Sequence, residues 1–96
     1  MSGGYFEYKQ YEIEEIARSI RKVIAKNDSI EKDEFGYVVG KQYSVSTIEK
    51  LQETVDILER AATMTQRVDY LLEGDDDEES FHERWDEELD KLGVIK

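Results

Sequence analysis

Apolar residues recur every three or four positions from Ile48 to Leu72 without interruption, and this pattern constrains the fold more than any other feature of the chain. Such spacing places the apolar side chains on one face of an α-helix. Ser46 and Glu49 form the S-x-x-E pattern that caps a helix N-terminus, and Gly74 supplies a left-handed stop. The sequence therefore predicts a helix of about 28 residues, roughly 42 Å long at 1.5 Å per residue.

A helix of this length exceeds what one partner helix can cover in so small a protein. The chain has 96 residues, a size at which a single core is only marginally sufficient. We therefore expect a homodimer that pairs through the long helix, whose small central residues permit a close helix crossing. The expected dimer interface consists of Leu51, Val55, Leu58, Ala62 and Thr65.

Two shorter helices are predicted on either side of the long one. Between Tyr8 and Lys26, helical spacing relates Ile13, Ile16, Ala17, Ile20, Val23 and Ile24. Residues 75–77 are three aspartates, which favour a helix N-terminus, and a narrow apolar stripe of Phe81, Trp85, Leu89 and Leu92 follows them. Proline is absent, so the prediction is a mainly all-α fold. It is a single domain over residues 1–96, in which the first and long helices form a hairpin and the third folds back.

Residues 28–43 fit neither the helical nor the strand period, and Gly36 and Gly40 interrupt their apolar positions. We expect an irregular segment here, either a short helix or a loop with buried apolar anchors. Two short strands, around residues 37–39 and near Val45, are a weaker alternative supported by the β-branched content.

The acidity of the chain is concentrated near its C-terminus. The net charge is −11, and residues 73–90 hold eleven acids against Arg84 alone. Five acids recur at helical spacing opposite the apolar stripe: Asp76, Glu79, Glu83, Glu87 and Asp90. Carboxylates one helical turn apart lie about 6 Å from each other, comparable with phosphates along a nucleic-acid strand. This face is therefore a candidate DNA mimic that binds a basic protein surface, and the alternative is a solvated face that only maintains solubility.

The N-terminal segment is rich in aromatic residues, namely Tyr5, Phe6, Tyr8 and Tyr11. A covering over the helical core is the favoured interpretation, because large exposed aromatic patches are uncommon. A binding patch is the alternative.

No catalytic or metal-binding motif is intact. His82 and Glu83 begin the H-E-x-x-H pattern of zinc proteases, but Asp86 replaces the second histidine, and the chain has no cysteine. Asp75, Asp77 and Glu79 resemble part of a calcium loop, although its sixth position is Ser80 instead of glycine. We expect no enzyme activity, no cofactor and no metal.

Two further absences bear on location and partners. No apolar run approaches a membrane span and no signal peptide is evident, so a cytoplasmic protein without membrane contact is expected. The acidic segment repels nucleic acid, which disfavours direct binding to it.

Both outer thirds of the chain contain distinctive sequence strings. These are residues 3–11 (GGYFEYKQY) with Ile13 and residues 16–17, and then residues 66–72 (QRVDYLL), 74–76, 78–81 and Arg84. Together they resemble a family of small uncharacterised proteins from bacteriophages and prophages. Asp77 departs from the glycine that the family pattern has at this point, and residues 28–43 have no counterpart. The resemblance implies a phage or prophage accessory protein that acts in the bacterial host cytoplasm.

These observations support three functional hypotheses. The first is a non-catalytic protein that binds another protein, a host or defence factor, through the acidic face. A structural or assembly role in the virion is the first alternative. Small-molecule binding by an oligomer, at a pocket near the N-terminal tyrosines, is the second.

Overall fold

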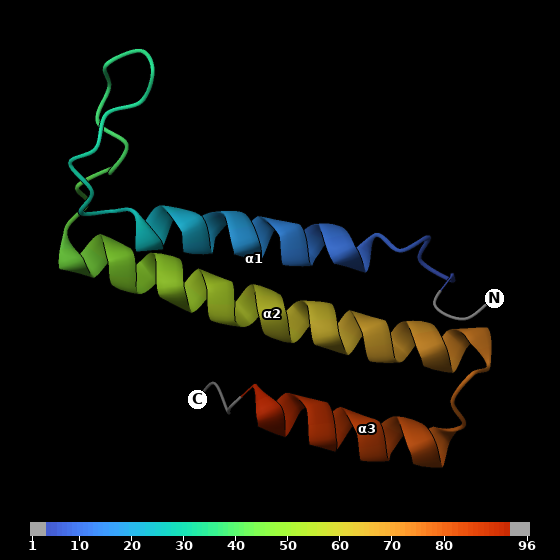
Figure 1. Ribbon diagram of the computed structural model, residues 1–96. Coiled ribbons are helices and arrows are strands. Elements are labelled where there is room, and N and C mark those ends of the chain that lie inside the picture. Colours follow the sequence, from blue (N-terminus) through green and yellow to red (C-terminus); the bar gives the residue numbers. More distant parts are fainter. Residues whose placement is uncertain (1–3, 93–96) are drawn as a thin grey trace.

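The computed structural model describes residues 4–92, which form three helices: α1 (Gln10–Ala25), α2 (Val45–Glu73) and α3 (Glu78–Lys91). Successive helices run in opposite directions, and α2 lies between the other two (Figure 1). The all-α fold, the hairpin of the first and long helices and the third helix folding back are therefore confirmed. No strand occurs among residues 4–92.

The long helix begins one residue after Ser44, whose side chain accepts a hydrogen bond from the Thr47 N–H. The predicted cap at Ser46 is therefore wrong, because Ser46 already lies inside the first turn. The predicted stop is confirmed, since Gly74 adopts the left-handed conformation with φ of 85°.

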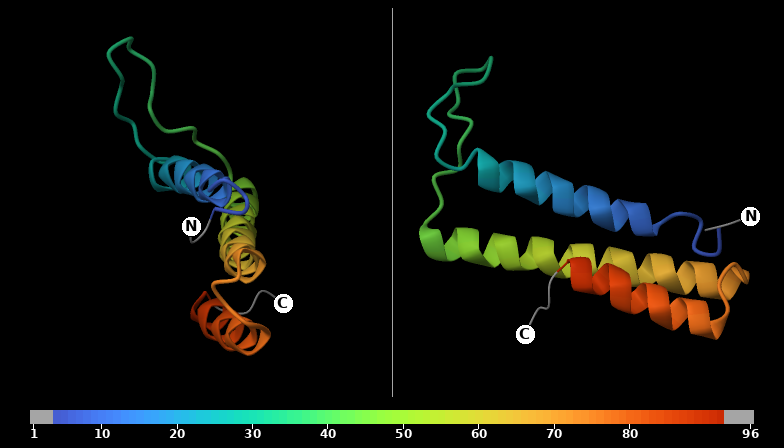
Figure 2. Two further views of the ribbon diagram at one scale, coloured as in Figure 1. Left: turned by 90° about the vertical axis from the view of Figure 1, so that its right-hand side faces the viewer. Right: turned by 60° about the horizontal axis from the view of Figure 1, so that its bottom comes forward.

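The three helices lie in a row, and α1 and α3 each contact α2 but not each other (Figure 2). This arrangement leaves a thin core, whose buried apolar side chains are Ala17, Val55, Ala62 and Leu89. The radius of gyration is 17.3 Å, against about 12.5 Å for a compact domain of this length. No helix among residues 4–92 is both long and apolar enough to cross a membrane.

Residues 28–43 form an arm that projects beyond the ends of α1 and α2 (Figure 1). Neither a short helix nor a pair of strands forms, because the arm holds only one antiparallel bridge, between Lys32 and Val38. At its tip the Asp33 carboxylate accepts the N–H groups of Phe35 and Tyr37, and Gly36 takes the left-handed conformation that closes the turn. The expected buried anchors are wrong, since Ile30, Phe35, Tyr37 and Val38 are all exposed.

A buried asparagine fixes the base of the arm. The Asn27 side chain accepts the Tyr43 N–H at 2.8 Å and donates to the Tyr43 carbonyl at 3.1 Å. Gly40 packs directly against the backbone of residues 26–29, because a Cβ atom on Gly40 would lie 2.4 Å from the Ser29 carbonyl oxygen. The base is therefore tightly packed even though the tip is exposed.

Candidate functional site

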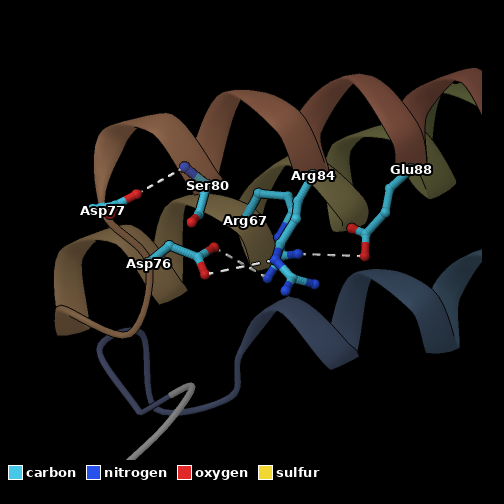
Figure 3. Close-up of polar contacts among 6 residues, drawn as sticks. All are labelled: Arg67, Asp76, Asp77, Ser80, Arg84 and Glu88. Carbon is cyan, nitrogen blue, oxygen red and sulfur yellow. Dashed lines mark hydrogen bonds and ion pairs between the residues drawn. The ribbon is translucent and has the colours of Figure 1, made fainter.

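The turn that leads into α3 is built by aspartate side chains. Asp77 is the N-cap residue, and its Oδ1 accepts the Ser80 N–H at 2.8 Å (Figure 3). This backbone hydrogen bond, together with one from the Ser80 side chain, lowers the pKa of Asp77 below its ordinary value of 3.8. The prediction that this aspartate triplet starts the third helix is confirmed.

An apolar stripe holds α3 against α2. Leu89 is buried, and Phe81 and Trp85 are half-buried with their ring centroids 5.4 Å apart. Because this stripe faces α2, the opposite side of α3 points to solvent.

Four of the five predicted acidic residues form the outer face of α3. Glu79, Glu83, Glu87 and Asp90 are all exposed, and they recur at intervals of four, four and three residues. Within the part of the chain that the structure describes, no lysine or arginine pairs with any of them. We call these four residues the acidic face; its carboxylates are free to bind an external cation.

The structure places Asp76 elsewhere, so its assignment to the exposed face is wrong. Its side chain is 11% exposed and forms ion pairs with Arg67 at 3.5 Å and with Arg84 at 3.9 Å (Figure 3). Asp76 precedes α3 in the turn after Gly74, where the chain bends back toward α2. Helical spacing therefore does not apply to this residue.

Arg67 is the central cation of this cluster, and no local motif indicates its role. Its side chain is 5% exposed, reaches from α2 between Asp76 and Glu88, and lies with its guanidinium carbon 4.5 Å from the centre of the Tyr70 ring. The Nη1 atom is 3.4 Å from the Glu88 carboxylate, so one arginine joins α2 to both the turn and the body of α3. The ion pairs of Arg67 with Asp76 and Glu88 thus hold α3, which carries the acidic face, against α2.

A cleft of about 540 Å³ lies beside this cluster. Its lining combines carboxylates, two arginines and two tyrosines: Tyr11, Glu14, Gln66, Arg67, Tyr70, Asp75, Asp76, Arg84 and Glu88. Four acids against two arginines give the lining a net charge of −2, so the cleft disfavours anions.

The expected dimer interface is divided between two sides of α2. Val55 and Ala62 are 0% and 2% exposed within a single chain, so their assignment to an intersubunit contact is wrong. Both lie on the side of α2 that packs on α1, where α1 contributes the buried Ala17. Leu51, Leu58 and Thr65 are half-buried and remain accessible to a second molecule.

The N-terminal aromatic residues do not cover the core. Tyr5, Tyr8 and Tyr11 are exposed, and Tyr8 and Tyr11 stack on each other with centroids 6.1 Å apart. The covering interpretation is therefore wrong for these three rings, and only Phe6 is half-buried.

A buried carboxylate holds this segment in place instead. Asp69 of α2 is 0% exposed and accepts the backbone N–H groups of Tyr5 at 3.4 Å and Phe6 at 3.3 Å, and the Gln10 side chain at 3.2 Å. Glu7 and Tyr8 follow with positive φ values of 56° and 63°. Asp69 therefore fixes a backbone turn, a role that no local sequence motif announces.

His82 is exposed and its ring contacts Phe81 edge-on, with centroids 5.4 Å apart. In the described range, 4–92, no three histidine, aspartate or glutamate side chains come close enough to hold a metal ion. Neither the zinc pattern nor the calcium pattern thus assembles a ligand set in this range.

No protein-family profile matches the chain, and neither a curated protein nor a solved structure shows significant similarity to it.

Proposed function

We propose that this protein is a non-catalytic binding protein that docks a basic surface of a partner protein on the acidic face of α3. The observation that carries the proposal is the set of four exposed carboxylates without cation partners, Glu79, Glu83, Glu87 and Asp90. Surface carboxylates that are not neutralised internally attract basic residues and steer their approach. A spacing of about 6 Å between them suits a groove that otherwise binds phosphates.

Rigidity supports the same proposal. The helix that carries the acidic face is anchored by Leu89 and by the ion pairs of Arg67, so its backbone presents the four carboxylates at a defined spacing. Binding then costs less conformational entropy than binding by a free acidic tail.

The projecting arm also favours a role in protein binding. Ile30, Phe35 and Tyr37 are at least 72% exposed on a tip whose turn is internally hydrogen-bonded. Exposed apolar clusters of this kind are typical of protein contact sites.

The biological setting belongs to the proposal as well. The similarity of residues 3–11 and 66–72 to small phage and prophage proteins supports a phage accessory role in the bacterial cytoplasm. A host or defence protein that normally binds DNA is the partner whose surface suits the acidic face.

The test is a pull-down from bacterial lysate with a matched pair of variants. One variant carries Glu79→Gln, Glu83→Gln, Glu87→Gln and Asp90→Asn. The control carries Glu12→Gln, Glu15→Gln, Glu49→Gln and Glu53→Gln, which remove the same charge from exposed positions on α1 and α2.

We expect the wild type and the control to capture the same partner, and both duplex DNA and high salt to release it. At about 1 M salt the Debye length falls to roughly 3 Å, which screens such contacts. The α3 variant should lose the partner while its helical circular dichroism is unchanged. Equal capture by both variants contradicts the proposal.

A further inference from the structure

One side of α2 is only partly covered after α1 and α3 have packed. Leu58, Ala61, Thr65, Val68 and Leu72 recur along it at intervals of three and four residues. Each residue of an α-helix advances about 100°, so Ala61 lies about 100° from Ala62, which faces α1, and about 120° from Arg67, which pairs with α3. These five residues therefore form a third stripe, and none of them is charged.

The same side of the helix row continues onto α1. Ile13 of α1 and Thr65 of α2 line a common groove of about 370 Å³ together with Tyr5, Phe6, Gln10 and the ion pair of Glu7 with Lys9. Ile16 follows one turn after Ile13 and is 53% exposed, although it is a large apolar residue. We call these two isoleucines of α1 together with the five-residue stripe of α2 the apolar side.

The opposite side of the row has a different character. Glu14, Arg21, Glu59 and Thr63 line a groove there, and Arg21 forms an ion pair with Glu59. Only one of the two sides is therefore both apolar and free of charged residues along α2.

The exposed area also indicates a missing partner. The accessible surface of the chain is 7180 Å², whereas a folded monomer of 11.3 kDa has about 5700 Å². This excess of roughly 1500 Å² belongs to the chain as a whole, the arm included. It is larger than the area of about 800 Å² that a standard protein interface takes from each partner.

We propose that two copies of this chain pair through the apolar side, related by a two-fold axis, to form a two-layer helical bundle. A spacing of three and four residues is the pattern by which identical helices interlock, and a two-fold axis brings each stripe onto its own copy. Repulsion between two chains of net charge −11 does not prevent this, because the acidic face lies on α3, at the edge of the row. A basic partner is drawn to that edge instead, so a second copy is the occupant that suits the uncharged stripe.

This interface differs from the one expected from sequence, since it uses Ala61, Val68 and Leu72 in place of the buried Val55 and Ala62. It is also independent of the proposed function, because dimerisation and partner binding use different surfaces. The pairing gives each assembly two acidic faces, which would increase the avidity for a partner that has repeated basic sites.

Sedimentation equilibrium from low to high micromolar concentration tests the pairing. We expect the wild type to have twice the monomer mass, and the variant Ile16→Glu with Leu72→Glu to be a monomer with unchanged helicity. The control is Tyr11→Glu with Leu92→Glu, which adds the same charge at residues of similar exposure that line grooves of the opposite side. It should remain a dimer.

A chemical cross-link keeps the proposal testable if the glutamate variant fails to fold. The chain contains no cysteine, so Ala61→Cys and Thr63→Cys each introduce a single thiol, on the apolar side and on the opposite side. A short bismaleimide should produce a covalent dimer with Ala61→Cys and not with Thr63→Cys. A wild type that is monomeric at high micromolar concentration, or cross-linking that does not favour Ala61→Cys, overturns the proposal.

Discussion

A guanidinium nitrogen of Arg67 lies 3.5 Å from a carboxylate oxygen of Asp76, and both side chains are almost completely buried between α2 and the turn before α3. Burial of a charge is unfavourable unless a partner compensates for it. The second partner of Arg67, Glu88, is 40% exposed and therefore compensates less. Asp76 is thus the residue on which the attachment of α3 most depends.

Replacing Asp76 with alanine is expected to lower the free energy of unfolding by about 3 kcal/mol, because the Arg67 charge stays buried and loses its most buried partner. Glu88→Gln should cost less than about 1 kcal/mol, as is usual for a partly exposed ion pair. Urea denaturation followed by circular dichroism measures both values. Equal losses for the two variants would show that burial does not distinguish the two ion pairs.

The helices themselves were predictable because they depend on local patterns. Apolar periodicity identified α2, glycine in the left-handed conformation ended it, and Asp77 started α3. Each of these signals acts within a few residues of the chain, so the sequence alone contains it.

The division of α2 among its neighbours was not predictable in the same way. Periodicity shows that Val55, Leu58, Ala62 and Thr65 are not on the polar side, but it does not show which neighbour covers each of them. In the structure α1 covers Val55 and Ala62, while Leu58 and Thr65 stay partly exposed. This choice depends on the packing angle between helices, which no single segment specifies.

The buried charges were missed for a related reason. Arg67 and Asp69 lie within α2 like any exposed polar residue, and their partners are far away in sequence or outside any helix. Phe6, whose N–H group Asp69 accepts, is 63 residues distant. The apolar residues of the arm predict burial, but Asp33 and Gly36 build a turn that needs no core.

Asp69→Asn is expected to detach the N-terminal segment from α2. Asparagine keeps one acceptor oxygen and turns an amide group toward N–H donors that need an acceptor. Hydrogen bonds to a charged group contribute about 1.5–3 kcal/mol, so a loss of about 2 kcal/mol in the free energy of unfolding is expected. Hydrogen exchange at the Tyr5 and Phe6 amides should accelerate more than exchange within α2.

The matched control for this variant is Asp75→Asn, which makes the same chemical change at an exposed position. It should leave both the stability and the exchange of Tyr5 and Phe6 unchanged. If the Tyr5 and Phe6 amides are as well protected from exchange in Asp69→Asn as in the wild type, the Asp69 carboxylate does not hold the turn.

The N-cap of α3 should respond to pH through Asp77. Because the Ser80 N–H stabilises the ionised carboxylate, the pKa of Asp77 in the folded state lies below its ordinary value of 3.8. The stabilisation from this cap is therefore fully present above pH 3.8 and is lost as the pH falls through the lower, folded pKa.

NMR spectra recorded on acidification should show the Ser80 amide resonance shifting with a midpoint below 3.8, as its hydrogen bond to the carboxylate weakens. Asp77→Asn keeps a capping oxygen that does not titrate, so the Ser80 shift with that midpoint should disappear in this variant. A midpoint at or above 3.8 in the wild type, or the same shift in Asp77→Asn, would assign the titration to another of the α3 acids.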